Sequence, residues 1–255
     1  GLATPDSTLA ANAVLSFVPG HNGSNQAVVI NPKQYIEISD PNAFPTVGNG
    51  VAANSDIIPV THGGGLDRGS ILAWIKPVLT GEAVVAVVAN FNETDSTACR
   101  FDIRSNGQVG SFLRGTDTGN MWEFSNFAAR PGTNIYDGNW HMVALTWDVR
   151  SGCTVYVDGT VAEFQAENTP NATFGPWNRP VLIGASRQST RTLLSSMFTG
   201  AIDNLRFNNY QVAHAVIAQE YYDYSGLLPC ATLVFEGSQF DVVQTGTSWC
   251  RVDME

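Results

Sequence analysis

The chain has few basic residues for its length. Its 255 residues include 13 lysines and arginines against 23 aspartates and glutamates, which gives a formal net charge of −10 at pH 7. The basic residues form no run. Because nucleic-acid binding requires clustered lysine and arginine to neutralise phosphates, this charge balance argues against nucleic acid as a partner.

Long apolar runs are also missing. A membrane-spanning helix needs about 20 apolar residues, whereas the longest apolar run, residues 83–89, has the length of one strand. We therefore predict a buried strand there and no membrane insertion. The sequence has no signal peptide, and its opening residues, GLATPDSTLA, resemble a mature terminus left by cleavage.

Familiar catalytic and phosphate-binding motifs do not occur. The sequence has no Gly-x-Ser-x-Gly elbow, and its four histidines are scattered without metal-ligand spacing. A glycine triplet at residues 63–65 lacks the Gly-Lys-Ser/Thr and the helix that follow in a phosphate loop. We interpret it as part of a long irregular loop, residues 41–67, and loops of that length are often functional.

Cysteine is scarce, but its number agrees with a second signal. Four cysteines are too few for a disulfide scaffold, although the number is even. Three N-glycosylation sequons lie in polar, loop-like sequence, at Asn22, Asn92 and Asn171. Chance is the alternative, because such tripeptides are common in polar sequence. We predict a secreted, extracellular or cell-surface protein and, if its source is eukaryotic, N-linked glycans on at least two of these sites.

The clearest pattern that is present is a β-meander over residues 139–166. The run WHMVALTW is apolar on both faces, with Val143, Leu145 and Trp147 on one side and Trp140, Met142 and Ala144 on the other. A strand that is apolar on both sides lies between two layers. Asp158-Gly159 then separates two β-rich runs and predicts a type I′ turn, in which both residues have positive φ.

At this meander the sequence resembles a known family. The run NWHMVALTWDVRSGCTVYVDGTVAEF is similar to the central meander of laminin-G-like and pentraxin-like jelly rolls, which are concanavalin A-type sandwiches. QYIEISD with GSILAWIKP resembles the opening strands, and FTGAIDNLRFNNYQVAHAVIAQEYYDY resembles the closing strand and short helix. The resemblance implies an all-β, two-sheet antiparallel jelly-roll sandwich with one short C-terminal helix.

The resemblance also suggests how the chain is divided. It covers residues 12–224, which leaves an N-terminal arm, residues 1–11, and a C-terminal β appendix, residues 225–255. The apolar spacing of Val212, Ala215, Val216 and Tyr222 predicts the short amphipathic helix. We read the appendix as an extra hairpin.

We predict that all four cysteines form disulfides. Four cysteines allow three connectivities. We favour Cys230–Cys250, which closes a short local loop and staples the appendix. The remaining pair, Cys99–Cys153, joins two strand ends near the central meander, where the Cα atoms are expected to approach to about 5.5 Å.

This fold carries lectins, adhesion modules, glycosidases and lyases, so the resemblance does not decide function. Glucanases of this class carry a strand with Glu-x-Asp-x-x-Glu, which does not occur here; the strands facing the cleft offer only Asp102 and Glu123. Lyases of this fold use Arg, Gln, His and Tyr on concave strands. Arg104, Arg114, His141 and Tyr156 have the right residue types, but the lyase motifs are missing and His141 fits a hydrogen-bonded strand histidine.

Calcium is a ligand of related families, but most of the acidic residues that would bind it are missing from this sequence. Pentraxins bind it with acids after the Leu-x-Gly strand, yet residues 182–197 hold no acid and two arginines. Laminin-G-like relatives use acids before the opening strand, where Lys33 and Gln34 stand here, together with the Asp of GAID, which is Asp203. Asp203 is a weak metal candidate with a structural role as its alternative. We predict no required cofactor and leave Ca²⁺ binding open.

Sugar binding is the remaining active-site hypothesis. Sugar sites combine an aromatic platform with planar polar side chains, because a pyranose has an apolar face and a rim of hydroxyls. Trp122 and Asn120 lie on a strand expected to line the concave sheet, Arg104 and Arg114 fall on neighbouring strands, and Trp177 lies in a loop near the rim. The alternative is that both tryptophans serve packing.

These observations favour a non-catalytic extracellular recognition or adhesion module, either carbohydrate-binding or a structural subunit of a larger surface or fibre assembly. The expected partner is a glycan or an extracellular protein, with self-assembly in an array as a further option. The alternative is a polysaccharide lyase or glycosidase of the same fold.

Overall fold

The structure is a computed structural model of the chain. It describes residues 15–23, 25–38, 46–47, 51–52, 68–90, 98–117, 120–128, 132–149, 151–166, 181–187, 194–208, 210–225, 233–235, 238–240, 242–245 and 248–252. The predicted arm, residues 1–11, lies outside these ranges, and so does most of the long loop.

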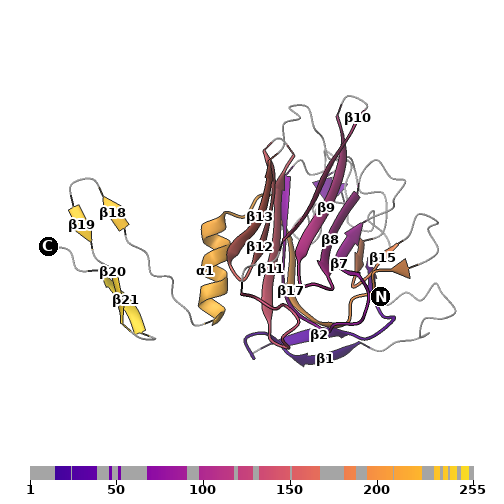
Figure 1. The fold of residues 1–255 in the computed structure, drawn as a ribbon, viewed down its shortest axis with the longest axis horizontal. Coiled ribbons are helices and arrows are strands. Elements are labelled where there is room, and N and C mark those ends of the chain that lie inside the picture. The colour runs from indigo at the N-terminus through magenta and orange to yellow at the C-terminus, as the bar shows by residue number, and fades with distance from the viewer. Residues whose placement is uncertain are drawn as a thin grey trace.

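Two antiparallel sheets form a jelly-roll sandwich, as predicted (Figure 1). The seven-stranded sheet contains, in spatial order, β1 (Ser16–Pro19), β2 (Gln26–Ile30), β17 (Gly200–Asn208), β6 (Arg68–Pro77), β11 (His141–Asp148), β12 (Gly152–Val157) and β13 (Thr160–Ala166). The six-stranded sheet contains β10 (Asn120–Ala128), β9 (Val109–Asp117), β8 (Ala98–Arg104), β7 (Val84–Asn90), β14 (Val181–Ile183) and β3 (Ile36–Ile38).

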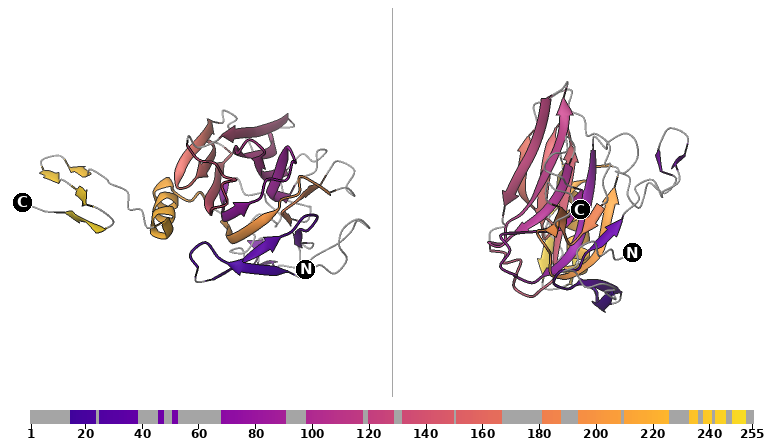
Figure 2. Two further views of the ribbon diagram at one scale, coloured as in Figure 1. Left: turned by 60° about the horizontal axis from the view of Figure 1, so that its bottom comes forward. Right: turned by 90° about the vertical axis from the view of Figure 1, so that its right-hand side faces the viewer.

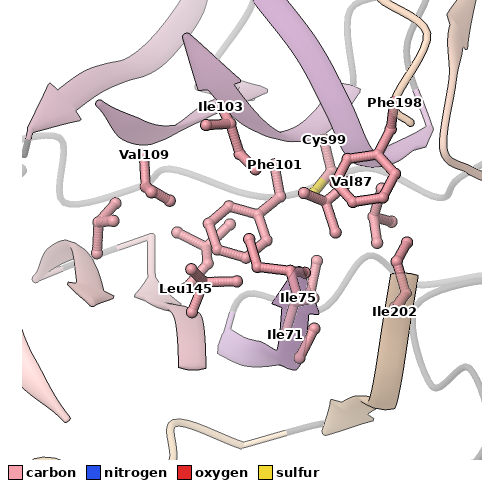
Figure 3. Close-up of a cluster of buried hydrophobic side chains, with 14 of the residues drawn as sticks. Ile71, Ile75, Val87, Cys99, Phe101, Ile103, Val109, Leu145, Phe198 and Ile202 are labelled. Carbon is pink, nitrogen blue, oxygen red and sulfur yellow. The ribbon is translucent and has the colours of Figure 1, made fainter. Parts of the chain in front are cut away.

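The core lies between the two sheets because alternate side chains of each strand point inward. Phe101 and Ile103 from β8 meet Ile71 and Ile75 from β6, as Figure 3 shows. Leu145 of β11 joins them, with its neighbours Val143 and Trp147 in the same cluster. This confirms the predicted inward face of the meander.

The opposite face of β11 is also buried, under a helix. α1 (His214–Ser225) packs on the outer face of the seven-stranded sheet, away from the six-stranded sheet (Figures 1 and 2). Met142 and Ala144 contribute to this cluster from the sheet and Ile217 contributes from the helix. The expected helical face is partly wrong, because Val216 is exposed and Ile217 points to the sheet. No described helix is long and apolar enough to cross a membrane.

The turn between β12 and β13 has the predicted geometry. Asp158 has φ 51° and Gly159 has φ 71°, so both lie in the left-handed region that a type I′ turn requires. Glycine is needed at position 159 for a second reason: a Cβ there would lie 2.9 Å from Cβ of Tyr221 on α1.

The predicted disulfide between Cys99 and Cys153 is not formed. Both are free cysteines and fully buried in the core. Cys99 lies on β8 and Cys153 on β12, which belong to opposite sheets, and packed sheets lie about 10 Å apart, beyond the Cα separation that a disulfide spans. Cys153 Sγ instead lies 3.3 Å from Oγ of Ser111.

Short paired strands complete the described chain. They are β4 (Thr46–Val47) with β5 (Val51–Ala52), β15 (Ser186–Arg187) with β16 (Leu194–Ser195), β18 (Leu233–Phe235) with β19 (Ser238–Phe240), and β20 (Val242–Thr245) with β21 (Ser248–Val252). The last two pairs lie beyond α1 from the sandwich (Figures 1 and 2). The appendix therefore has two hairpins where we expected one. Cys230 is outside the described residues, so its pairing with Cys250 stays a prediction, as do the domain boundaries.

Candidate functional site

The candidate site lies on the outer face of strand β8, which carries charged side chains. Its sequence, ACRFDIR, alternates so that Cys99, Phe101 and Ile103 enter the core. Arg100, Asp102 and Arg104 occupy the alternate positions, which face away from the core. Phe112 and Arg114 of β9 hold the equivalent outer positions, since the inner ones are Ser111 and Leu113. We call this set, Arg100, Asp102, Arg104, Phe112 and Arg114, the arginine face.

The register explains how the face is shaped. Arg100 is paired with Phe112, and Asp102 lies between Ala86 of β7 and Gly110 of β9, two small residues. A β-bulge in β7 falls directly after Ala86. Bulges redirect neighbouring side chains and often stand beside functional sites. The small neighbours let the Asp102 carboxyl sink into the sheet surface between the longer arginines.

Asp102 is the most unusual ionisable group of the face. Its side chain is 0% exposed, and the Nε of Arg100 donates a hydrogen bond to its Oδ2. Its Oδ1 is buried without a hydrogen-bond partner. Burial raises the pKa of Asp102 to about 7, against the opposing influence of Arg100 and Arg104. The carboxyl therefore changes protonation near neutral pH.

The other side chains of the face are half-buried. The guanidinium of Arg114 lies over the Phe112 ring, 4.7 Å from its centroid, which is a cation–π contact. Phe112 also packs against Ala86 and Ala89. Arg104 Nη1 donates a long hydrogen bond of 3.4 Å to Oε1 of Gln108. The face thus presents three positive charges and one aromatic ring.

Only some of the residues of this site were identified from the sequence. Arg104 and Arg114 were candidates and lie on the face, whereas Arg100 and Phe112 were missed although the alternation in β8 and β9 could have identified them. The register puts Glu123, not Trp122, opposite Arg114. Trp122 is opposite Gly115 and Asn120 is opposite Asp117, and their side chains are not described. Trp177 is outside the described residues, so the three remain predictions.

The four residues considered for the lyase alternative do not lie close together. Tyr156 lies under α1 on the outer face of the seven-stranded sheet, and His141 begins β11 of the same sheet. Arg104 and Arg114 belong to the other sheet. The four side chains therefore do not line one site.

His141 is held between two carboxylates. Its Nδ1 lies 3.0 Å from Oδ2 of Asp158, and its Nε2 lies 3.1 Å from Oδ1 of Asp137. A neutral imidazole has one N–H, so only the imidazolium donates to both acids. Burial lowers the pKa of His141, but hydrogen bonds and charge from Asp158 and then Asp137 outweigh it, so the pKa is raised. The predicted strand histidine is part of a structural ion-pair network.

Asp203, the weak metal candidate, is occupied by hydrogen bonds. His21 Nδ1 lies 2.6 Å from Oδ2 of Asp203, and Asn25 Nδ2 donates to Oδ1 at 3.1 Å. The His21 ring stacks on Trp74 with centroids 4.4 Å apart. Gly20 leaves room for this network, because a Cβ there would lie 2.4 Å from the Asp203 carboxylate. Among the described residues no group of three His, Cys, Asp or Glu could hold a metal.

Of the three sequons, one lies in the described chain. Asn22 is exposed in the turn between β1 and β2, a position that a glycan could occupy. Asn92 and Asn171 lie outside the described ranges. Glycosylation at all three stays a prediction.

The chain belongs to the concanavalin A-like lectin/glucanases superfamily. Residues 47–218 match this family, Laminin_G_3, which covers most of the sandwich. A comparison with curated proteins finds no match. The resemblance inferred from the meander is therefore confirmed at the level of the family.

Solved structures with the same fold are distant in sequence. The binding domain of Paraclostridial Mosquitocidal Protein 1 is 12% identical, with a TM-score of 0.53, 82% of this chain covered and 46% of that chain. The botulinum neurotoxin serotype G binding domain is 11% identical, with a TM-score of 0.54 and coverage of 86% and 46%. This chain thus spans less than half the length of either.

A third structure has a more similar size. Domain 4 of an extracellular GH43 arabinanase from Geobacillus stearothermophilus, solved in complex with arabinotriose, is 17% identical, with a TM-score of 0.51. The alignment covers 82% of this chain and 81% of that one. At these identities the likeness concerns the fold alone.

Proposed function

We propose that this chain is a non-catalytic extracellular recognition module that binds glycans through the arginine face. The observation that carries the proposal is the composition of that face: three arginines and an aromatic ring gather on the outside of the six-stranded sheet. The corresponding face of the seven-stranded sheet is occupied by α1.

The face has the chemistry that sugar recognition needs. Guanidinium groups are planar donors that suit the hydroxyl rim of a sugar, and the guanidinium of Arg114 is held by its contact with the Phe112 ring. Rigid strands position Arg100, Arg104 and Arg114, so little entropy is lost in ordering the backbone on binding. The arabinanase domain with bound arabinotriose, and the toxin binding domains, support a binding role for a sandwich of this kind.

The described part of the site does not support catalysis. Hydrolysis of a glycosidic bond uses two carboxyl groups roughly 5–9 Å apart. On the outer face of β7, β8 and β9, Asp102 is the acid that the described side chains provide, and it is hydrogen-bonded to Arg100. The separation of His141 and Tyr156 from the arginines argues in the same way against a lyase.

A protein partner or self-assembly is a second candidate. It is favoured by apolar side chains that are exposed on the two edge strands of the seven-stranded sheet, Phe17 and Val18 on β1 and Val161 and Phe164 on β13. Edge strands with such side chains can pair with another chain. Light scattering over a concentration series tests this; a monomer at every concentration argues against an array.

A glycan array with the intact chain, with and without calcium, tests the main proposal. We expect binding that Arg104→Gln and Arg114→Gln each weaken at least tenfold. Arg68→Gln is the matched control, because Arg68 is exposed on β6 of the other sheet and carries the same charge. Absence of glycan binding, or equal loss in all three variants, contradicts the proposal.

A further inference from the structure

Resting on the proposed glycan-binding function, we propose that the arginine face selects glycans that carry carboxylate groups, and that Asp102 makes this binding tighter at lower pH. The ligand class follows from the charge of the face, and the pH dependence follows from the buried carboxyl at its centre.

The local charge opposes the charge of the whole protein. The chain carries a net charge of −10, yet the described outer positions of β8 and β9 hold Arg100, Arg104 and Arg114 around one acid. At about 3.3 Å per residue along a strand, Arg100 and Arg104 are roughly 13 Å apart, so the charge forms a stripe. Guanidinium groups match carboxylates with paired, charge-assisted hydrogen bonds, which are stronger than the hydrogen bonds they donate to neutral hydroxyl groups.

Only one of the two carboxyl oxygens of Asp102 has a hydrogen-bond partner. A buried polar atom without a hydrogen bond is uncommon in folded proteins and costs free energy. Oδ1 of Asp102 is such an atom, while Oδ2 accepts from Arg100. The buried carboxyl does not reach a ligand itself, but its charge lies among the three arginines. An ionised Asp102 repels a ligand carboxylate on the face, and protonation removes that repulsion. The protonated form is therefore the one that binds an acidic ligand.

The surroundings of Asp102 define the direction and size of the pH effect. Ala86 on β7 and Gly110 on β9 carry no charge. Among the described residues, the ionisable groups near Asp102 are Arg100 and Arg104 on its own strand, Arg114 diagonally across, and the buried thiol of Cys99, whose pKa is raised by burial and then by Cys153 and Asp102. Glu123 is paired with Arg114 one strand farther out.

With a pKa of about 7, Asp102 is about nine-tenths protonated at pH 6 and about one-tenth at pH 8. If the protonated form binds, the affinity falls about tenfold between these values, because proton uptake and ligand binding are linked.

Titration calorimetry of the intact chain with tetragalacturonate, at pH 6 and pH 8, tests the proposal. The matched probe is the same tetrasaccharide with methyl-esterified carboxylates, which keeps the sugar and removes the charge. We expect binding of the free acid, about tenfold tighter at pH 6, and binding of the ester at least tenfold weaker. Asp102→Asn should bind the acid equally at both pH values, since an amide does not titrate. Arg68→Gln should bind as the unmodified chain does.

Every other outcome contradicts one part of the proposal. Equal binding of acid and ester removes the carboxylate selectivity while leaving glycan binding intact. Binding of the acid without pH dependence in the unmodified chain removes the role of Asp102, whether or not the variant folds. Tighter binding of an acidic peptide, such as tetraglutamate, replaces the glycan with a protein ligand. No binding of either tetrasaccharide overturns this inference, and the proposed function falls with it only if the glycan array is also negative.

Discussion

The Asp158→Asn substitution isolates the charge that holds His141. Asparagine tolerates the positive φ of position 158 and can still accept from the Met142 N–H, which lies 3.1 Å from Oδ1. What is lost is the negative charge 3.0 Å from His141 Nδ1, in a pair whose side chains are less than one-tenth exposed. A hydrogen bond between charged groups contributes about 1.5–3 kcal/mol. We therefore expect the free energy of unfolding at pH 5.5 to fall by about 2 kcal/mol.

The effect should depend on pH with a defined sign. The folded pKa of His141 is raised above the ordinary 6.5. Stabilisation by the pair is fully present below the unfolded pKa and is lost as pH rises through the raised folded pKa. Once the pH exceeds the raised folded pKa, the histidine is neutral in both forms of the protein. The difference between the unmodified chain and Asp158→Asn should therefore shrink toward pH 9, to about 1 kcal/mol or less.

Urea unfolding followed by tryptophan fluorescence at pH 5.5 and pH 9 measures both numbers. A loss of about 2 kcal/mol corresponds to a fall in Tm of about 4–8 °C for a chain of this size. Asp137→Asn is the control, because Asp137 also contacts His141 but its side chain is 35% exposed, and exposed pairs contribute about 1 kcal/mol or less. Equal destabilisation by Asp158→Asn at both pH values would refute the reasoning.

Three further predictions concern other parts of the sandwich. Asp102→Asn should stabilise the chain by up to about 4 kcal/mol at pH 8 and by less at pH 5. The raised pKa means that the stability contributed by the protonated Asp102 is complete below about pH 4 and is lost as the pH rises through 7, whereas asparagine does not ionise. Thermal melts that show no gain at pH 8 contradict this. Gly20→Ala should cost about 2 kcal/mol in urea unfolding, because the nearest side-chain oxygen would lie 2.0 Å from the new Cβ. Gly23→Asn, in open space, should cost little. Cys99 and Cys153 should resist iodoacetamide at pH 8 until urea is added, because burial raises both thiol pKa values, that of Cys153 to about 12; mass spectrometry that finds native labelling would show access to the core.

The sandwich was predictable where the apolar pattern is strong. The meander could be assigned because β11 is apolar on both faces, and the reason is now visible: one face packs in the core and the other under α1. The buried face of α1 was harder to predict, because the rotation of a helix about its own axis against a sheet depends on tertiary packing. Val216 and Ile217 are adjacent and equally apolar, and only the fold makes Ile217 the buried one.

The site was less predictable because it depends on register and on distances between sheets. Arg104 and Arg114 could be chosen as candidates on neighbouring strands, but the pairing of Arg114 with Glu123 follows from a strand register that sequence does not specify. The pairing of Cys99 with Cys153 failed for a related reason. Both residues have the strand positions of core residues, but their strands lie in different sheets.

Nuclear magnetic resonance of the arginine Nε–H groups tests the central claim most directly, because each arginine gives its own signal. Tetragalacturonate is added to the ¹⁵N-labelled chain at pH 6, and the signals are assigned by single Arg→Gln substitutions. We predict that the signals of Arg100, Arg104 and Arg114 shift together with one affinity, while those of Arg68 and of Arg206, which is paired with Glu220, do not. Shifts confined to Arg68 or Arg206 would place the glycan on the other sheet and contradict the assignment of the arginine face.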